Sequence, residues 1–147
     1  MNPMLALRQY QKVGAHAQAS EASPHRLVQM LMEGGLDRIA QAKGAMERKD
    51  IPGKCVSIGK AIGIIGGLRE GLDLENCADT LGELDSLYIY MMKRLTEANI
   101  SSDSKILDEV AGLLRTVKEG WDGIAAPGPQ FYGDHHESCI AANRTDP

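Results

Sequence analysis

Apolar residues recur at steps of three and four over most of the chain, which is the spacing of one face of an α-helix. The pattern predicts four amphipathic helices, at residues 24 to about 49, 52 to about 72, about 78 to 99, and from just after 103 to about 124. No strand-like alternation competes with it. The four predicted core stripes are Val28, Leu31, Gly35, Ile39, Ala42 and Met46; Cys55, Ile58, Ile62, Ile65 and Leu72; Cys77, Leu81, Leu84, Tyr88, Met91, Leu95 and Ala98; and Ile106, Val110, Leu113, Val117, Trp121 and Ile124.

Helix start and stop signals agree with this division. In Ser23-Pro24 the hydroxyl can accept an unpaired backbone N–H, and proline fits the first helical position. Ile51-Pro52 breaks and restarts the chain, and Ser101, Ser102 and Asp103 offer caps for the last helix. Because four such helices cannot bury their stripes singly, the sequence predicts an all-α fold, an antiparallel up-down four-helix bundle.

The bundle is expected to occupy residues 23–126. Residues 1–22 have a weaker helical pattern, followed by an Ala/Ser-rich linker, and are expected to form a short mobile N-terminal helix. Residues 127–147 are rich in Pro, Gly and polar side chains, so a disordered tail is expected there.

The third predicted helix has more apolar surface than one core requires. Residues 87–92 are apolar or aromatic at every position, so Ile89, Tyr90 and Met92 are left over beside the core stripe, next to Leu87. Two explanations stay open: a partner covers the surplus, or the N-terminal segment buries it. Both hold if that segment is a displaceable lid, with Leu7, Tyr10 and Val13 as its apolar face.

Glycine recurs every four residues on the second predicted helix, at Gly59, Gly63, Gly67 and Gly71. Missing side chains allow another backbone to approach closely, either inside the bundle or as a peptide in an external groove. On the second explanation, the flank bearing Ile64 and Leu68 forms the wall opposite the surplus residues of the third helix.

Composition narrows the function. The net charge of -4, without any Lys/Arg-rich run, argues against nucleic acid and membrane as partners. The three cysteines form no C-x-x-C pair, so reduced thiols in the cytoplasm are expected. No segment is apolar enough for a signal peptide or a spanning helix.

The sequence shows little that is typical of a catalytic site. Helical bundles that bind metals bury Glu-x-x-His motifs, and none occurs here. A phosphotransfer histidine must be exposed in mid-helix, whereas His25 falls in a first helical turn. We therefore expect no enzyme activity, cofactor or metal site.

Several motifs, taken in order, resemble the flagellar export chaperone FliS family over about residues 7–124. They are Ser23-Pro24-His25-x-Leu27-Val28-x-Met30-Leu31, Lys60-Ala61-Ile62-x-Ile64-Ile65, Leu72-Asp73, Leu87-Tyr88-x-Tyr90-Met91-x-x-Arg94-Leu95-x-x-Ala98-Asn99 and Leu107-Asp108-Glu109-Val110-x-x-Leu113-Leu114, closing at Trp121.

The resemblance implies a cytoplasmic chaperone that binds the disordered C-terminal segment of flagellin, prevents premature polymerisation and delivers flagellin to the export gate, a further partner. The alternative function is a helical scaffold or regulator that uses the same apolar face for a folded protein. The predicted partner-binding residues are Leu7, Tyr10, Val13, Ile64, Leu68, Leu87, Ile89, Tyr90 and Met92.

Overall fold

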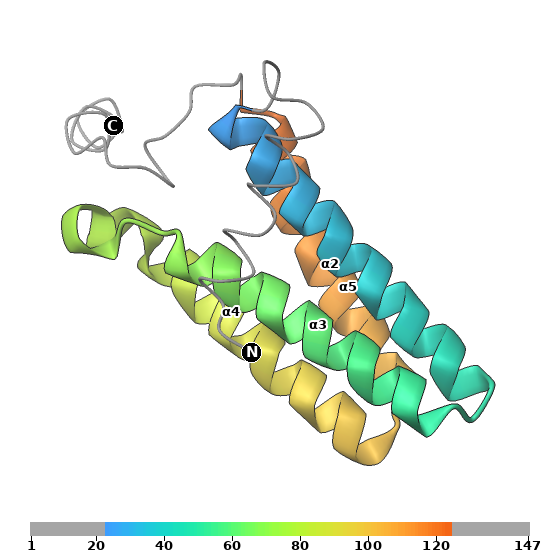
Figure 1. The fold of residues 1–147 in the computed structure, drawn as a ribbon. Helices are drawn as coiled ribbons and strands as arrows, with labels where there is room; N and C mark the ends of the chain where they lie inside the picture. Colours follow the sequence, from blue (N-terminus) through green and yellow to red (C-terminus); the bar gives the residue numbers. More distant parts are fainter. Residues whose placement is uncertain (1–22, 125–147) are drawn as a thin grey trace.

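The computed structural model describes residues 23–124, which form four helices without a strand in this range. They are α2 (Pro24–Glu47), α3 (Ile51–Glu70), α4 (Leu74–Ser101) and α5 (Ser104–Asp122). Successive helices run in opposite directions, and α5 returns beside α2 to close the bundle (Figure 1). The predicted all-α bundle is confirmed. The expected N-terminal helix and disordered tail lie outside the described residues.

Side-chain caps fix where the helices begin. The Ser23 hydroxyl accepts the Arg26 N–H at 3.1 Å, so α2 starts where the sequence predicted. Asp50 and Asp103 cap α3 and α5 in the same way. The prediction for α4 began four residues too late, because Asp73 caps an additional first turn that ends at an irregular Cys77 (φ -127°), and it ended two residues too early.

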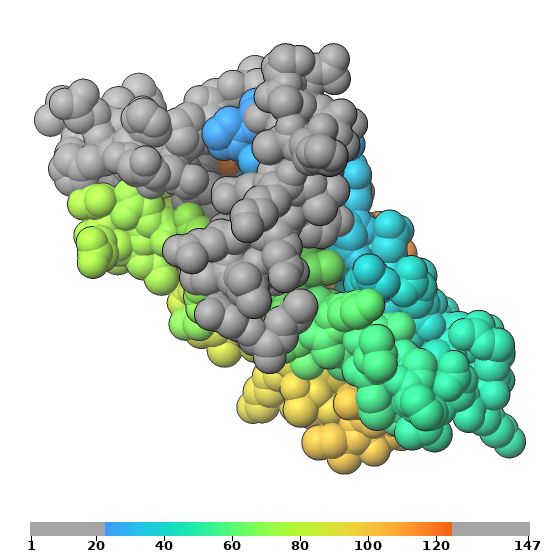
Figure 2. Space-filling view, viewed as in Figure 1, coloured from blue at the N-terminus to red at the C-terminus, as the bar shows by residue number. Residues whose placement is uncertain are grey.

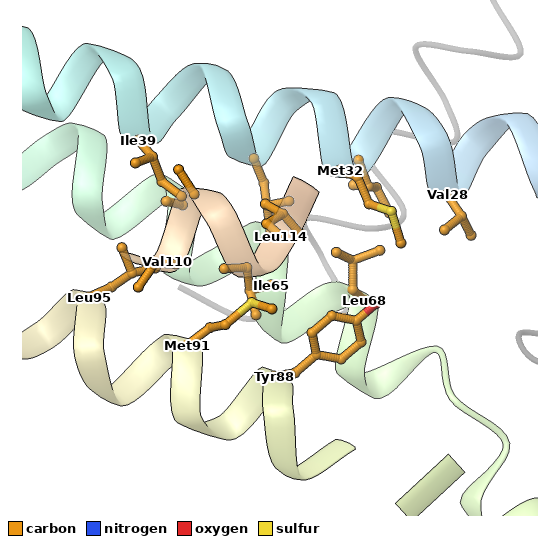
Figure 3. Close-up of a cluster of buried hydrophobic side chains, with 14 of the residues drawn as sticks. Val28, Met32, Ile39, Ile65, Leu68, Tyr88, Met91, Leu95, Val110 and Leu114 are labelled. Carbon is orange, nitrogen blue, oxygen red and sulfur yellow. The ribbon is translucent and has the colours of Figure 1, made fainter. Parts of the chain in front are cut away.

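The core lies between all four helices and contains most residues of the predicted stripes, together with Met32, Leu68, Leu107 and Leu114, which the stripes did not include (Figure 3). Tyr88, Met91 and Leu95 of α4 are fully buried against Ile65 of α3 and Leu114 of α5. Such burial contributes roughly 1.5–3 kcal/mol for each large apolar side chain.

Two stripe predictions need correction. Cys55 is exposed, because it lies on the flank of α3 that faces the surface beside α4. On α5 the fully buried residues are Leu107, Val110 and Leu114, and the predicted Ile106, Leu113 and Val117 are only partly buried. The core face of α5 is therefore rotated toward α2 relative to the prediction.

Polar contacts tie neighbouring helices together at their ends. The buried Lys54 ammonium donates to the Asn99 carbonyl and to the Ser102 hydroxyl, both at 2.8 Å. Arg69 forms an ion pair with Asp85 at 2.8 Å, nearer the other end of the same two helices. These contacts fix the antiparallel register of α3 against α4.

Among the described helices, α3 has the length and apolar composition of a possible membrane span. Its second half is buried within the protein at nearly every position from Gly63 to Leu68. Burial in a helical bundle therefore accounts for its composition.

Two of the three cysteines lie within the described residues. Within residues 23–124, Cys55 is a free, exposed thiol, as expected. Cys77 is buried in the core.

Candidate partner-binding surface

The outer side of α4 carries the predicted surplus of apolar side chains. Ile89 and Tyr90 are 44% and 41% exposed, respectively, although their neighbours Tyr88 and Met91 are fully buried. Leu87 and Met92 are partly buried and pack against the core. Of the three surplus residues and their neighbour Leu87, Ile89 and Tyr90 thus offer the most surface to a partner.

A polar network holds the Tyr90 ring in place. Its hydroxyl donates to Glu109 Oε2 of α5 at 2.6 Å, and Arg94 Nε donates to Glu109 Oε1 at 2.9 Å. The two hydrogen bonds lower the pKa of the Glu109 carboxyl, and the bond to Glu109 raises the pKa of the Tyr90 phenol. A partner would therefore meet a preorganised aromatic side chain, which reduces the entropy lost on binding.

The prediction that Ile64 and Leu68 form an exposed wall is wrong for the described structure. Ile64 is 8% exposed and Leu68 is 1% exposed, and both belong to the core cluster. They lie within the second half of α3 that is buried almost all round. Leu7, Tyr10 and Val13, the remaining predicted contacts, lie outside the described residues.

Some glycines of α3 fit close packing inside the bundle, and one lies on the surface, as the alternative of an external groove would require. Gly63, Gly66 and Gly67 are buried, as close packing requires. Gly59 is exposed, and a Cβ atom placed there would meet no atom within 4 Å.

A cavity of about 310 Å³ opens between α4 and α5 and reaches α2, and it was not anticipated from the sequence. All but two of the side chains around it are apolar or aromatic, so it suits an apolar group rather than a charged one. The lining residues are Met32, Thr80, Leu81, Leu84, Tyr88, Val117, Gly120, Trp121 and Ile124.

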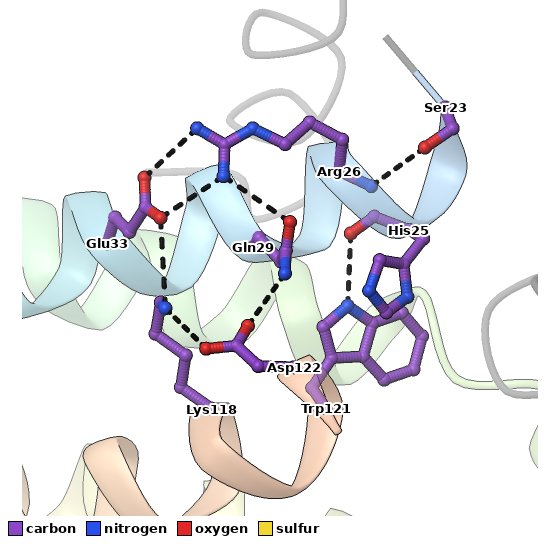
Figure 4. Close-up of polar contacts among 8 residues, drawn as sticks. All are labelled: Ser23, His25, Arg26, Gln29, Glu33, Lys118, Trp121 and Asp122. Atoms are coloured by element: carbon purple, nitrogen blue, oxygen red, sulfur yellow. Dashed lines mark hydrogen bonds and ion pairs between the residues drawn. The ribbon is translucent and has the colours of Figure 1, made fainter. Parts of the chain in front are cut away.

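The start of α2 is fastened to the end of α5 beside this cavity (Figure 4). The Trp121 indole N–H donates to the His25 carbonyl at 3.0 Å, and the two rings stack with centroids 4.8 Å apart. His25 is buried, whereas phosphotransfer needs an exposed imidazole. The geometry therefore gives His25 a packing role.

Around this stack, exposed charges link the same two helices. Gln29 donates to Asp122 at 2.7 Å, and Lys118 pairs with Asp122 at 2.7 Å and with Glu33 at 3.8 Å. The Lys118 hydrogen bond is the main cause that lowers the pKa of the Asp122 carboxyl. Within residues 23–124 no three His, Cys, Asp or Glu side chains are grouped so that they could hold a metal ion.

A family model for the flagellar protein FliS matches residues 6–128. The chain belongs to the FliS family. The resemblance seen in the motifs is thereby confirmed.

Relatives in the FliS family cover most of the chain. The flagellar secretion chaperone FliSB of Pseudomonas aeruginosa is 61% identical over 125 residues, which are 85% of this chain and 99% of the relative. The flagellar secretion chaperone FliS of Vibrio cholerae is 43% identical over 119 residues, or 81% of this chain and 88% of its own. The protein of the same name from Salmonella typhimurium is 36% identical over 120 residues, which are 81% of this chain and 89% of the relative. The FliS family is one of chaperones in flagellar secretion, not a class of enzymes.

Proposed function

We propose that this FliS-family protein is a cytoplasmic chaperone that binds the C-terminal segment of flagellin, keeps it from polymerising early and delivers it to the export gate. The observation that carries the proposal is the exposed pair Ile89 and Tyr90, with the Tyr90 ring fixed by Glu109, in a chain of the FliS family. A disordered segment that folds on binding needs an apolar surface on which to order, not a catalytic pocket. Ile89 and Tyr90, flanked by Leu87 and Met92, supply part of such a surface. The segment Leu7, Tyr10 and Val13 is proposed as its displaceable cover.

The test is a titration of the protein with the isolated C-terminal segment of its cognate flagellin, followed by calorimetry and circular dichroism. We expect binding together with a gain of helix, because the segment orders on the apolar surface. Ile89→Ala should weaken binding about tenfold, since a buried aliphatic side chain contributes roughly 1.5–3 kcal/mol at an interface. Tyr90→Phe keeps the ring but loses the bond to Glu109 that holds it, so it should bind about two- to threefold more weakly than the parent, and Tyr90→Ala should bind about tenfold more weakly.

Ile51→Ala is the matched control, because Ile51 is the same residue type with a similar exposure of 52% and lies in the first turn of α3. It should leave the affinity unchanged. If Ile89→Ala lowers the melting temperature of the free protein and spares binding, this surface is not the site. If the isolated segment fails to bind and only intact folded flagellin does, the protein is instead a scaffold for a folded partner.

A further inference from the structure

The cavity between α4 and α5 connects the core with the surface. Three of its lining residues, Met32, Leu81 and Tyr88, are fully buried and form its inner side. Thr80 of α4 and Gly120 of α5 are exposed and form its mouth. A side chain that enters between them from the surface would therefore reach the core.

The walls of the cavity are apolar side chains that the bundle leaves partly covered. Leu84 of α4 and Val117 and Ile124 of α5 follow the core period of their helices, yet each is only partly buried. At this end of the bundle α2 and α5 diverge from α3 and α4 (Figure 1), and the start of α2 (blue) lies apart from the start of α4 (yellow-green) in Figure 2. A further apolar group would complete the packing here.

The chain leaves α5 directly from a wall of the cavity, because Ile124 is both a lining residue and the final residue of the described range. The match to the FliS family ends at residue 128, so the residues that follow lie beyond it. Among them are the only phenylalanine of the chain, Phe131, and next to it Tyr132. Segments rich in Pro, Gly and polar residues usually contain few aromatic side chains. The aromatic pair therefore favours a packing contact.

The aromatic pair is close enough in sequence to return to the cavity. Phe131 comes seven residues after Ile124, and seven extended residues span at most about 25 Å, twice the diameter of a helix. Pro127-Gly128-Pro129 lies between them and is typical of a chain reversal. A short connection gives an effective concentration of about millimolar, so a contact too weak for a separate ligand can be populated.

We propose that the C-terminal segment folds back onto the bundle and that the Phe131 ring enters the cavity, against Leu84 and Val117. The cavity has about 310 Å³ and an almost entirely apolar lining, which suits a phenyl ring without polar atoms. Neighbouring side chains of an extended segment point to opposite sides, so Tyr132 stays at the mouth with its hydroxyl in water. The segment is thus an intramolecular ligand of the bundle, and this contact is independent of flagellin binding.

The experiment is nuclear magnetic resonance of the full-length protein with labelled Leu and Val methyl groups. We expect nuclear Overhauser contacts from the Phe131 ring to the methyl groups of Leu84 and Val117. Phe131→Ala should remove them and should raise acrylamide quenching of Trp121, the only tryptophan and a lining residue, by about 1.5- to threefold, because the ring no longer covers the indole. Gln130→Ala changes the neighbouring residue and should leave the quenching unchanged.

A second pair of variants tests the cavity itself. A Cβ atom at Gly120 would meet no atom within 4 Å, so Gly120→Leu places its side chain in the mouth and should reduce the Phe131 contacts about threefold or more. Gly112→Leu is the matched control, because Gly112 lies on the same helix with the same open space but does not line the cavity. Both changes favour the helix equally, so only Gly120→Leu should affect the contacts.

Contacts to Leu84 and Val117 from Leu7, Tyr10 or Val13 would identify the N-terminal segment as the occupant and overturn the inference. Contacts found only between differently labelled copies of the chain would identify a second copy and overturn it as well. The inference also fails if the parent shows no Phe131 contacts, or if Gly112→Leu reduces them as much as Gly120→Leu. None of these results bears on the titration with flagellin, so the proposed function is tested separately.

Discussion

Single residues with the same chemistry have different roles here because of where they lie. Tyr88 and Tyr90 are two positions apart on α4, yet the first is fully buried and the second is 41% exposed. Lys54 likewise differs from Lys60, since Lys54 is buried and donates to the last turn of α4 while Lys60 is exposed. Burial and partners decide the contribution of each side chain, not the residue type.

Trp121 provides a test at this scale. Replacing it with Phe removes a buried hydrogen bond to the His25 carbonyl and shrinks the ring beside the cavity. We expect Trp121→Phe to lower the free energy of unfolding by about 1–3 kcal/mol. Tyr90→Phe also removes one hydrogen bond, but at an exposed site, and should cost less than about 1 kcal/mol. Urea unfolding of both variants measures the difference; equal losses would show that the indole contact is not buried.

Hydrogen-bond networks that contain titratable carboxyl groups link neighbouring helices. Glu109 joins α5 to Tyr90 and Arg94 of α4, and these bonds lower its pKa from the ordinary value of 4.5. A carboxylate whose pKa is lower in the folded state than in the unfolded state stabilises the fold at pH values above its unfolded pKa. That stabilisation is lost as the pH falls through the folded value.

We therefore expect the urea midpoint to decrease as the pH is lowered below about 4.5, with Asp122 adding to the decrease at still lower pH. Glu109→Gln should flatten the first part of this profile, because the amide does not titrate. The effect should be small, since exposed ion pairs stabilise weakly. Identical profiles for the parent and Glu109→Gln between about pH 5 and pH 3 would contradict the assignment.

At the scale of the whole molecule, the described bundle is expected to account for the stability. Deleting residues 1–15 should leave the bundle folded and should keep or raise the association rate with the flagellin segment, because the proposed cover is removed. Stopped-flow fluorescence of Trp121 would measure that rate. A loss of binding would instead make Leu7, Tyr10 and Val13 part of the permanent contact surface.

The sequence alone determined the helices, the bundle and the family. The signals are local: caps such as Ser23, the period of the α4 stripe and the ordered motifs. They can therefore be recognised without knowing which helices lie next to one another. The first turn of α4 was missed because residues 73–76 are mostly polar and resemble a connecting turn, although Asp73 caps a helical turn there.

Only the tertiary structure decided which side of each helix is covered. Ile64 and Leu68 have the same apolar character as Ile89 and Ile100, yet the first pair is in the core and the second is on the surface. The rotation of α5 and the cavity beside Trp121 depend in the same way on how the helices cross. A helical period defines an apolar face only to within about a third of the circumference, and packing against neighbours selects the residues within it.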